Sequence, residues 1–199
     1  MMPAHIATPV PATSPRNLLW TVDQFHYLGD LGMFEGRRAM LIDGVIVEEG
    51  ALNPPHRIAL ELAGEALRTA FGAGWRVCVQ MPLVLGQSTD PEPDIAVIAG
   101  TPRGTTSHPT TAALVVEVAD SSLRFDTTVK LAVFAAGLIA DYWVLDVNAR
   151  QLLVFRDPRP DPTGAHGHTY LTQQIFGPAD TLAPLAAPGR TVNVTDLLP

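Results

Sequence analysis

The chain has 199 residues, of which 47% are hydrophobic and 17% charged, as is typical of one folded domain with a substantial core. Its formal net charge of −7 argues against a broadly basic surface, so a phosphate ligand would need a local basic face or a bound cation. The single cysteine, Cys78, excludes an internal disulfide and is predicted to be a buried thiol. No apolar stretch of the sequence has the length of a membrane span.

The beginning of the chain, residues 1–18, is rich in proline, alanine and threonine. This composition predicts a flexible lead-in to a single domain over residues 19–199. The same segment has neither the charged nor the apolar region of a secretory signal, so the expected location is the cytoplasm.

The first predicted elements are a short helix and a β-hairpin. Thr21 is a suitable N-cap for a helix over residues 21–30. Two apolar runs within residues 39–49 are separated by Asp43-Gly44, a dipeptide typical of a tight hairpin turn.

A longer helix is predicted to open at Asn53-Pro54-Pro55 and to continue to residue 71, because proline fits the first helical turn. Helical spacing predicts a stripe of side chains that face the core. Its members are Ile58, Leu62, Ala66, Leu67 and Phe71.

Strands dominate the remainder of the chain. They are predicted at residues 75–85, 91–98, 113–118, 141–147 and 151–156, with a further extended segment at 168–176. The run at 113–118 lacks the alternation of a half-exposed strand, which predicts a central strand buried on both faces. Residues 126–137 are predicted to form a helix between Asp126 as N-cap and Gly137 as C-cap. This order predicts an α/β or α+β fold, with one mixed central β-sheet flanked by helices.

Two acidic residues and one lysine are the best candidates for chemistry. Glu117 lies within the apolar run 114–118, where a carboxylate is costly unless it is paired or binds a metal. Asp94 stands at the entry of the strand 91–98, and Lys130 is the only lysine among 13 Lys and Arg residues. Two carboxylates on neighbouring strands can hold Mg²⁺ or Mn²⁺, and a nearby lysine can orient or activate the attacking water.

Each of these residues also has a simpler interpretation. Glu117 can lie at an exposed strand end or meet an arginine, and Asp94 can serve as a turn or capping residue after Pro93. Lys130 can be an ordinary surface residue in a chain that favours arginine. The three together, in this order, favour a metal-dependent phosphodiesterase site.

Taken in order, several segments resemble the PD-(D/E)xK nuclease-like superfamily, and more narrowly the Uma two family of restriction-endonuclease-like proteins. They are LIDGVIV (41–47), Pro-Pro-His56, PEPDIAVI (91–98), LVVEVADSSL (114–123), Asp126 with Lys130, and DYWVLD (141–146). The resemblance spans roughly residues 18–157. It implies a restriction-endonuclease-like core that cleaves nucleic acid, with Mg²⁺ or Mn²⁺ as cofactor.

The resemblance also implies site residues. The predicted metal ligands are Asp94 and Glu117 with the adjacent Val118, and the predicted catalytic residues are Asp94, Glu117, Lys130 and His56. His56, at the start of a helix, can bond a phosphate or a carboxylate and transfer a proton, or it can be a half-buried residue bonded to backbone.

Two departures from the family pattern affect the site. The superfamily usually places its lysine two residues after the acidic residue, where this chain has Ala119. Family members usually carry a glutamate just before the LIDG-like segment, where this chain has Met40. Its role could pass to Asp43 or Glu48, or the site could be weakened or inactive.

Three functional hypotheses follow. The first is a Mg²⁺- or Mn²⁺-dependent endonuclease with DNA as the expected substrate. A homodimer fits this hypothesis, because nucleases that cut a duplex often pair two sites. The second is a degenerate nuclease-like module that binds nucleic acid or a protein partner without cleavage. The third is an assembly protein whose apolar strands near 141–155 form a homodimer surface.

Overall fold

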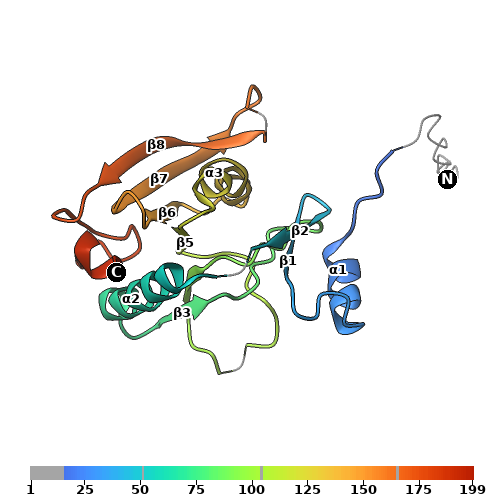
Figure 1. Ribbon diagram of the computed structural model, residues 1–199, viewed down its shortest axis with the longest axis horizontal. Helices are drawn as coiled ribbons and strands as arrows, with labels where there is room; N and C mark the ends of the chain where they lie inside the picture. Colours follow the sequence, from blue (N-terminus) through green and yellow to red (C-terminus); the bar gives the residue numbers. More distant parts are fainter. Residues whose placement is uncertain (1–15, 51, 104, 165) are drawn as a thin grey trace, which may run out of the picture.

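A computed structural model describes residues 16–50, 52–103, 105–164 and 166–199 (Figure 1). The predicted lead-in over residues 1–18 lies outside the described residues except for its last three. In the part of the chain that is described, no helix combines the length and apolar character needed to cross a membrane.

The N-terminal helix and hairpin form as the sequence predicts. Helix α1 (Val22–Asp30) begins at Thr21, whose side chain and that of Gln24 form a capping box. Strands β1 (Arg38–Ile42) and β2 (Val45–Glu49) pair in antiparallel fashion. Asp43 and Gly44 between them have φ values of 48° and 79°, the left-handed pair that the tight turn requires.

A six-stranded sheet forms the centre of the molecule, in the order β3-β4-β5-β6-β7-β8. Its strands are β3 (Trp75–Val79), β4 (Ile95–Ala99), β5 (Leu114–Ala119), β6 (Asp141–Asp146), β7 (Gln151–Pro160) and β8 (His168–Phe176). Only β5 and β6 run parallel, and every other neighbouring pair is antiparallel. The mixed sheet is therefore confirmed, and all six residues of β5 are buried as predicted. Cys78 on β3 is half-buried, contrary to the prediction of a buried thiol, because β3 is an edge strand.

Helix α2 (Pro54–Phe71) packs on one face of the sheet, and Leu67 and Phe71 are buried there as predicted. The first half of its buried stripe differs from the prediction. Ile58 is 49% exposed, whereas the neighbouring Ala59 and Leu60 are buried. Ala59, Ala63 and Ala70 let the helix approach the sheet closely, so small residues occupy the contact that the sequence pattern assigned to Ile58 and Leu62.

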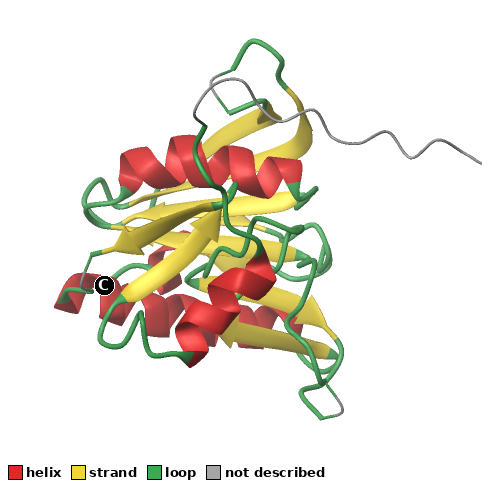
Figure 2. Cartoon of the chain, turned by 90° about the vertical axis from the view of Figure 1, so that its right-hand side faces the viewer, coloured by secondary structure: helices red, strands yellow, loops and turns green. Residues whose placement is uncertain are grey.

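The opposite face of the sheet is covered by the segment that connects β5 to β6. This segment consists of α3 (Leu123–Phe125), a π-helical turn (Asp126–Lys130) and α4 (Leu131–Ala136). Figure 1 shows α2 and this segment on opposite sides of the sheet, and Figure 2 shows helices above and below the strands. Gly137 follows the helix as predicted, but Asp126 is not its N-cap: the helix begins earlier, after Ser122, and Asp126 lies inside it.

Strands β6 and β7 are core elements. Every residue of β6 is buried, Tyr142 and Trp143 have no exposed surface, and Leu152–Phe155 are buried on β7. The prediction of an exposed apolar dimer surface at 141–155 is therefore wrong, because the two helical layers cover these strands.

The chain ends beside α2. Short strands β9 (Thr181–Leu182) and β10 (Val192–Asn193) pair with each other, and a 3₁₀ turn (Val194–Leu197) follows. Leu182, Val192, Val194 and Leu197 join the core cluster under α2.

Candidate active site

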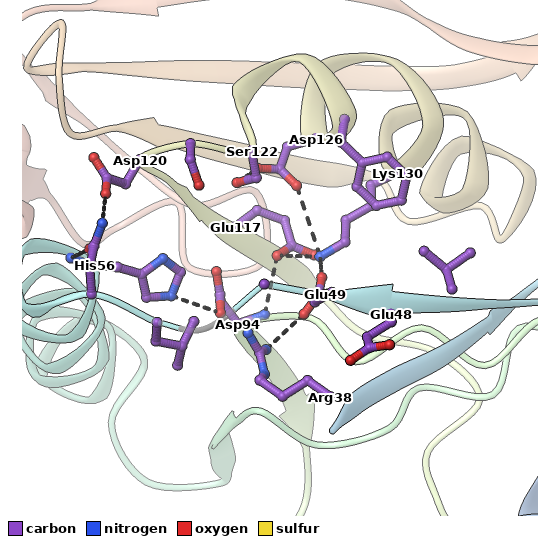
Figure 3. Close-up of a pocket in the computed structure, with 16 residues that line it drawn as sticks. Arg38, Glu48, Glu49, His56, Asp94, Glu117, Asp120, Ser122, Asp126 and Lys130 are labelled. Atoms are coloured by element: carbon purple, nitrogen blue, oxygen red, sulfur yellow. Dashed lines mark hydrogen bonds and ion pairs between the residues drawn. The ribbon is translucent and has the colours of Figure 1, made fainter. Parts of the chain in front are cut away.

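A cavity of about 290 Å³ lies where β4 begins and β5 ends. The hairpin β1–β2, the start of α2 and the segment after β5 supply its walls (Figure 3). Its polar lining residues are Arg38, Glu48, Glu49, Asn53, His56, Asp94, Glu117, Asp120, Ser121, Ser122, Asp126 and Lys130.

The sheet register brings Asp94 and Glu117 together. Ile95 on β4 pairs with Val116 on β5, and the next step of this antiparallel register sets Asp94 opposite Glu117. Residues opposite each other in such a pair point to the same face of the sheet. The backbone N–H of Asp94 accordingly donates to Glu117 Oε2 over 3.4 Å.

Glu117 is almost completely enclosed, with 1% of the residue exposed. Its Oε2 contacts Lys130 and the Asp94 amide, but its buried Oε1 has no hydrogen-bond partner among the described residues. Burial raises the pKa of Glu117 well above its ordinary value; the Lys130 charge opposes this shift, and the charges of Asp94 and Asp126 add to it. An unpaired buried carboxylate oxygen is costly, and a bound cation would satisfy it.

Asp94 has the opposite environment although it is also buried. His56 Nε2 lies 3.2 Å from its Oδ1, and the backbone N–H of Val118 donates to its Oδ2 over 2.9 Å. Burial raises the pKa of Asp94, but the hydrogen bond and charge of His56, together with the Lys130 charge, outweigh this effect and lower the pKa below its ordinary value. Asp94 is therefore held as an ionised carboxylate.

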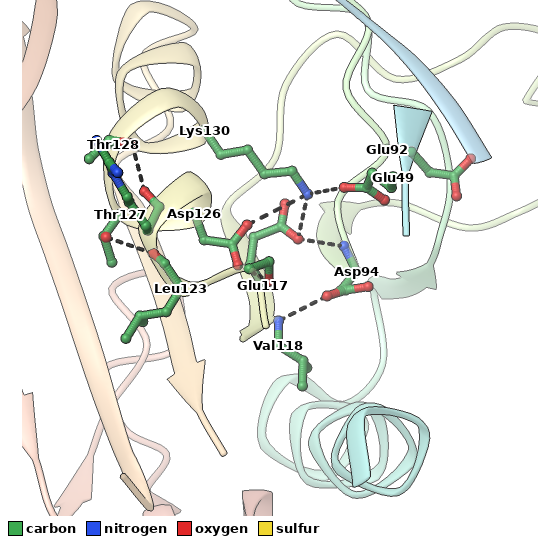
Figure 4. Close-up of polar contacts among 12 residues, drawn as sticks. Glu49, Glu92, Asp94, Glu117, Val118, Leu123, Asp126, Thr127, Thr128 and Lys130 are labelled. Carbon is green, nitrogen blue, oxygen red and sulfur yellow. Dashed lines mark hydrogen bonds and ion pairs between the residues drawn. The ribbon is translucent and has the colours of Figure 1, made fainter. Parts of the chain in front are cut away.

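Lys130 is buried at the end of the π-helical turn and points at the carboxylates (Figure 4). Its Nζ lies 2.7 Å from Glu49 Oε1, 3.0 Å from Glu117 Oε2 and 3.9 Å from Asp126 Oδ1. Burial lowers the pKa of Lys130, but Glu117, Glu49 and Asp126 together raise it above its ordinary value. The raised pKa favours the role of a charged hydrogen-bond donor for Lys130 over the role of a base that activates water.

Asp126 contributes to the site from within the π-helical turn. Ser122 Oγ donates to its Oδ2 over 2.5 Å, and its side chain is 2% exposed. Burial raises the pKa of Asp126 to about 6, and Lys130 and Ser122 oppose the shift. The hydroxyls of Thr127 and Thr128 donate to backbone carbonyls one turn earlier, which satisfies part of the backbone of this irregular turn (Figure 4).

Comparison with known proteins identifies the family. The Uma2 family model, described as "Putative restriction endonuclease", matches residues 22–195. The chain belongs to the Uma2 family. Among solved structures, it is similar to a crystal structure of a "putative nuclease belonging to DUF820" from Anabaena variabilis, with a TM-score of 0.68 and 15% sequence identity, over 89% of this chain and 96% of that chain. At this identity the likeness shows a shared fold, and no curated protein matches the chain.

In this Uma2 protein, the four residues predicted to be catalytic line the one cavity just described: Asp94, Glu117, Lys130 and His56. Val118, predicted as a third metal ligand, has no side-chain atom that could bind a metal. Its N–H donates to Asp94, so its carbonyl oxygen is the only atom it could offer as a ligand. His56 is positioned by Asn53, the N-cap of α2, whose side chain accepts from the His56 backbone and donates to Asp120.

The structure also shows which carboxylate stands near the position of the family glutamate. Met40 is buried in an apolar cluster, Asp43 bonds Thr89 at the hairpin turn, and Glu48 pairs with the exposed Arg37. Glu49, not Asp43 or Glu48, contacts Lys130. The hairpin register could have suggested Glu49. Met40 on β1 pairs with Val47 on β2, and side chains two residues apart on a strand point to the same face, so Glu49 lies on the face of Met40 and Val47.

The donor atoms of the cavity fit a hard divalent cation. Asp94 and Glu117 offer carboxylate oxygens, and Glu117 Oε1 lacks any other partner among the described residues. No group of three His, Cys, Asp or Glu side chains in the described ranges is placed to hold a metal alone. Mg²⁺ commonly binds through one or two carboxylates while waters and substrate phosphates fill its other positions, so this donor set suits it.

Proposed function

We propose that this Uma2 protein is a divalent-metal-dependent nuclease that hydrolyses phosphodiester bonds, with DNA as its substrate. The observation that carries the proposal is the unpaired, buried Oε1 of Glu117 in a cavity shared with Asp94 and Lys130. A core position that leaves a carboxylate oxygen unsatisfied is expensive to maintain unless the oxygen has a ligand during function.

The surrounding side chains divide the work of hydrolysis. A bound divalent cation would polarise the phosphodiester and lower the pKa of a water molecule. Lys130, a permanent cation, stabilises the negative charge that develops on the phosphate oxygens in the transition state. Asp94 stays ionised and fixes the His56 ring through Nε2, and His56 transfers a proton during the attack of water or the departure of the leaving group.

The test is cleavage of plasmid and phage DNA, with bis(p-nitrophenyl) phosphate as a sequence-independent substrate, in Mg²⁺ or Mn²⁺. We expect Glu117→Gln to lower kcat/KM at least about a thousandfold, as expected for a group needed in the transition state. Glu48→Gln is the matched control: Glu48 lies at the edge of the same cavity, but its side chain is 57% exposed and pairs with Arg37, not with Lys130. Turnover that survives Glu117→Gln would exclude the proposed site.

A non-cleaving module is the second candidate. It is favoured by Met40 in place of an acidic residue and by Lys130, which partly neutralises the carboxylates without a metal. The same assay decides between the two, because this candidate predicts no turnover with any divalent metal.

A homodimer in the cytoplasm is the proposed working form, and sedimentation at micromolar concentration tests the dimer.

A further inference from the structure

Arg38 is the accessible positive charge of the cavity. Among the described residues that line it, Arg38 and Lys130 are the only Lys or Arg side chains. The Arg38 side chain is 25% exposed, whereas that of Lys130 is 3% exposed. Six carboxylates also line the cavity, so an anionic ligand that enters it must meet Arg38 to offset their repulsion.

The hairpin holds Arg38 close to Lys130. Arg38 on β1 pairs with Glu49 on β2, and its Nη2 lies 2.8 Å from Glu49 Oε2. The other oxygen of the same carboxylate, Oε1, lies 2.7 Å from Lys130 Nζ. A single carboxylate therefore separates the guanidinium at the mouth from the ammonium beside Glu117 (Figure 3).

The second contact of Arg38 is looser. Its Nη2 lies 3.7 Å from Glu92 Oε1, and the Glu92 side chain is 32% exposed. Both side chains of this pair are half-buried, and at 3.7 Å the contact is longer than a hydrogen bond, so another anion can replace Glu92 at this guanidinium. Glu49 would meanwhile keep the arginine in place, which leaves the other guanidinium N–H groups free to bind a phosphate.

We infer that Arg38 binds a non-scissile phosphate of the substrate strand, next to the phosphate that is cleaved beside Glu117 and Lys130. This inference rests on the proposed nuclease function. A nucleic acid strand carries a phosphate at every nucleotide, so a strand cleaved near Lys130 brings a neighbouring phosphate to the mouth of the cavity. Arg38 thereby makes the site prefer a polynucleotide to an isolated phosphodiester.

The experiment compares two substrates that differ in their number of phosphates. We expect Arg38→Gln to lower kcat/KM for a DNA oligonucleotide by about tenfold or more, and to change that for bis(p-nitrophenyl) phosphate by less than about twofold. Arg38→Lys retains part of the activity on DNA because it keeps the charge but not the planar fork. Arg37→Gln is the matched control, because this neighbouring side chain is 63% exposed and pairs with Glu48.

Binding provides a readout that does not depend on turnover. In a Glu117→Gln background, fluorescence anisotropy of a labelled oligonucleotide gives affinity as a function of salt concentration. Loss of one phosphate contact should reduce the slope of log K against log salt by about 1 for Arg38→Gln, and leave it unchanged for Arg37→Gln.

Three results would overturn the inference. In the first, Arg38→Gln lowers kcat/KM equally for both substrates, which would assign Arg38 to the cleaved phosphate or to the positioning of Glu49. In the second, Arg38→Gln changes neither kcat/KM nor the salt slope, and in the third the wild-type protein does not bind the oligonucleotide. A wild-type protein that binds the oligonucleotide but hydrolyses neither substrate would refute the proposed function alone, since the salt slope still tests Arg38.

Discussion

Asp94 and Glu117 face each other across two adjacent strands, yet their surroundings differ. Asp94 has a hydrogen-bond partner on each oxygen and a lowered pKa. Glu117 has an unpaired oxygen and a pKa raised well above the ordinary value. The protein supplies a partner for both oxygens of Asp94, whereas Oε1 of Glu117 needs a bound cation or a proton to offset its burial.

This contrast separates two parts of the cavity. The part built from α2 and β4 is preorganised by His56 and Asn53. The part built from β5 and the π-helical turn concentrates Glu117, Asp126 and Glu49 around one ammonium. The first part supplies fixed geometry, whereas the second part holds excess negative charge that a metal can use.

The strongest test of the contrast is metal binding. We expect Glu117→Gln to weaken Mn²⁺ binding by more than about a hundredfold and Asp94→Asn by about tenfold. Of these two carboxylates, only Glu117 has an oxygen without a partner among the described residues. Because the pKa of Glu117 is raised, a metal that binds there displaces a proton from this carboxyl group, so the affinity of the wild-type protein for Mn²⁺ should rise with pH. Calorimetry in two buffers of different ionisation enthalpy measures both effects. If Asp94→Asn abolished proton release and Glu117→Gln kept it, the contrast would be reversed.

Removal of the central cation should have the next largest effect. Lys130→Met leaves Glu117 and Glu49 without their buried partner and should lower the free energy of unfolding by about 3 to 5 kcal/mol at pH 7. Urea denaturation measures this change. The double variant Lys130→Met/Glu117→Gln should recover part of the loss, because it removes the uncompensated charge. A double variant as unstable as the single one would show that packing, not charge, explains the loss.

Asp126 should make the second part of the cavity sensitive to pH. Its pKa of about 6 lies above the unfolded value, so the folded state keeps a proton that the unfolded state releases. The contribution of Asp126 to stability should therefore fall as the pH rises from about 4 to 6, and level off above that range. Asp126→Asn removes this loss. The difference in free energy of unfolding between the variant and the wild type should therefore be roughly 2 to 3 kcal/mol more favourable to the variant at pH 7 than at pH 4. Thermal unfolding across this range checks it, and a difference that does not vary with pH would contradict it.

Glu49 should have the smallest effect of the four. Glu49→Gln removes the charge closest to Lys130 but keeps an oxygen that can accept its hydrogen bond. We expect about a tenfold decrease in kcat, or about 1.4 kcal/mol, with little change in stability. Glu48→Gln, one residue earlier on the opposite face of β2, serves as the control. Equal rates for both variants would remove Glu49 from the site.

The sequence predicted the parts of the fold that depend on local rules. Asp43-Gly44 predicted the hairpin, the apolar run around Glu117 predicted the central strand, and the order of Asp94, Glu117 and Lys130 predicted a shared location. These features depend on turn chemistry, burial and strand order, which can be inferred from the amino-acid sequence.

Features that depend on three-dimensional contact were missed. The α2 stripe was assigned to Ile58 rather than Ala59, because hydrophobicity ranks isoleucine first whereas close helix–sheet packing selects alanine. Asp126 was assigned to a helix N-cap, because no propensity rule marks a π-helical turn. Glu49 lies far from Lys130 in sequence, and only the hairpin's position against the helix brings them together.

The π-helical turn has a consequence for how this protein can change by mutation. A turn of this kind carries one residue more than the α-helical path around it, as if a single codon had been inserted between Ser122 and Leu131. Phe134 and Ala135 anchor the following helix in the core. Deletion of one codon within 126–130 would rotate the upstream residues by about 100° about the helix axis while this anchor stays in place. One short deletion could thus remove the lysine or Asp126 from the cavity and leave a folded descendant without its chemistry.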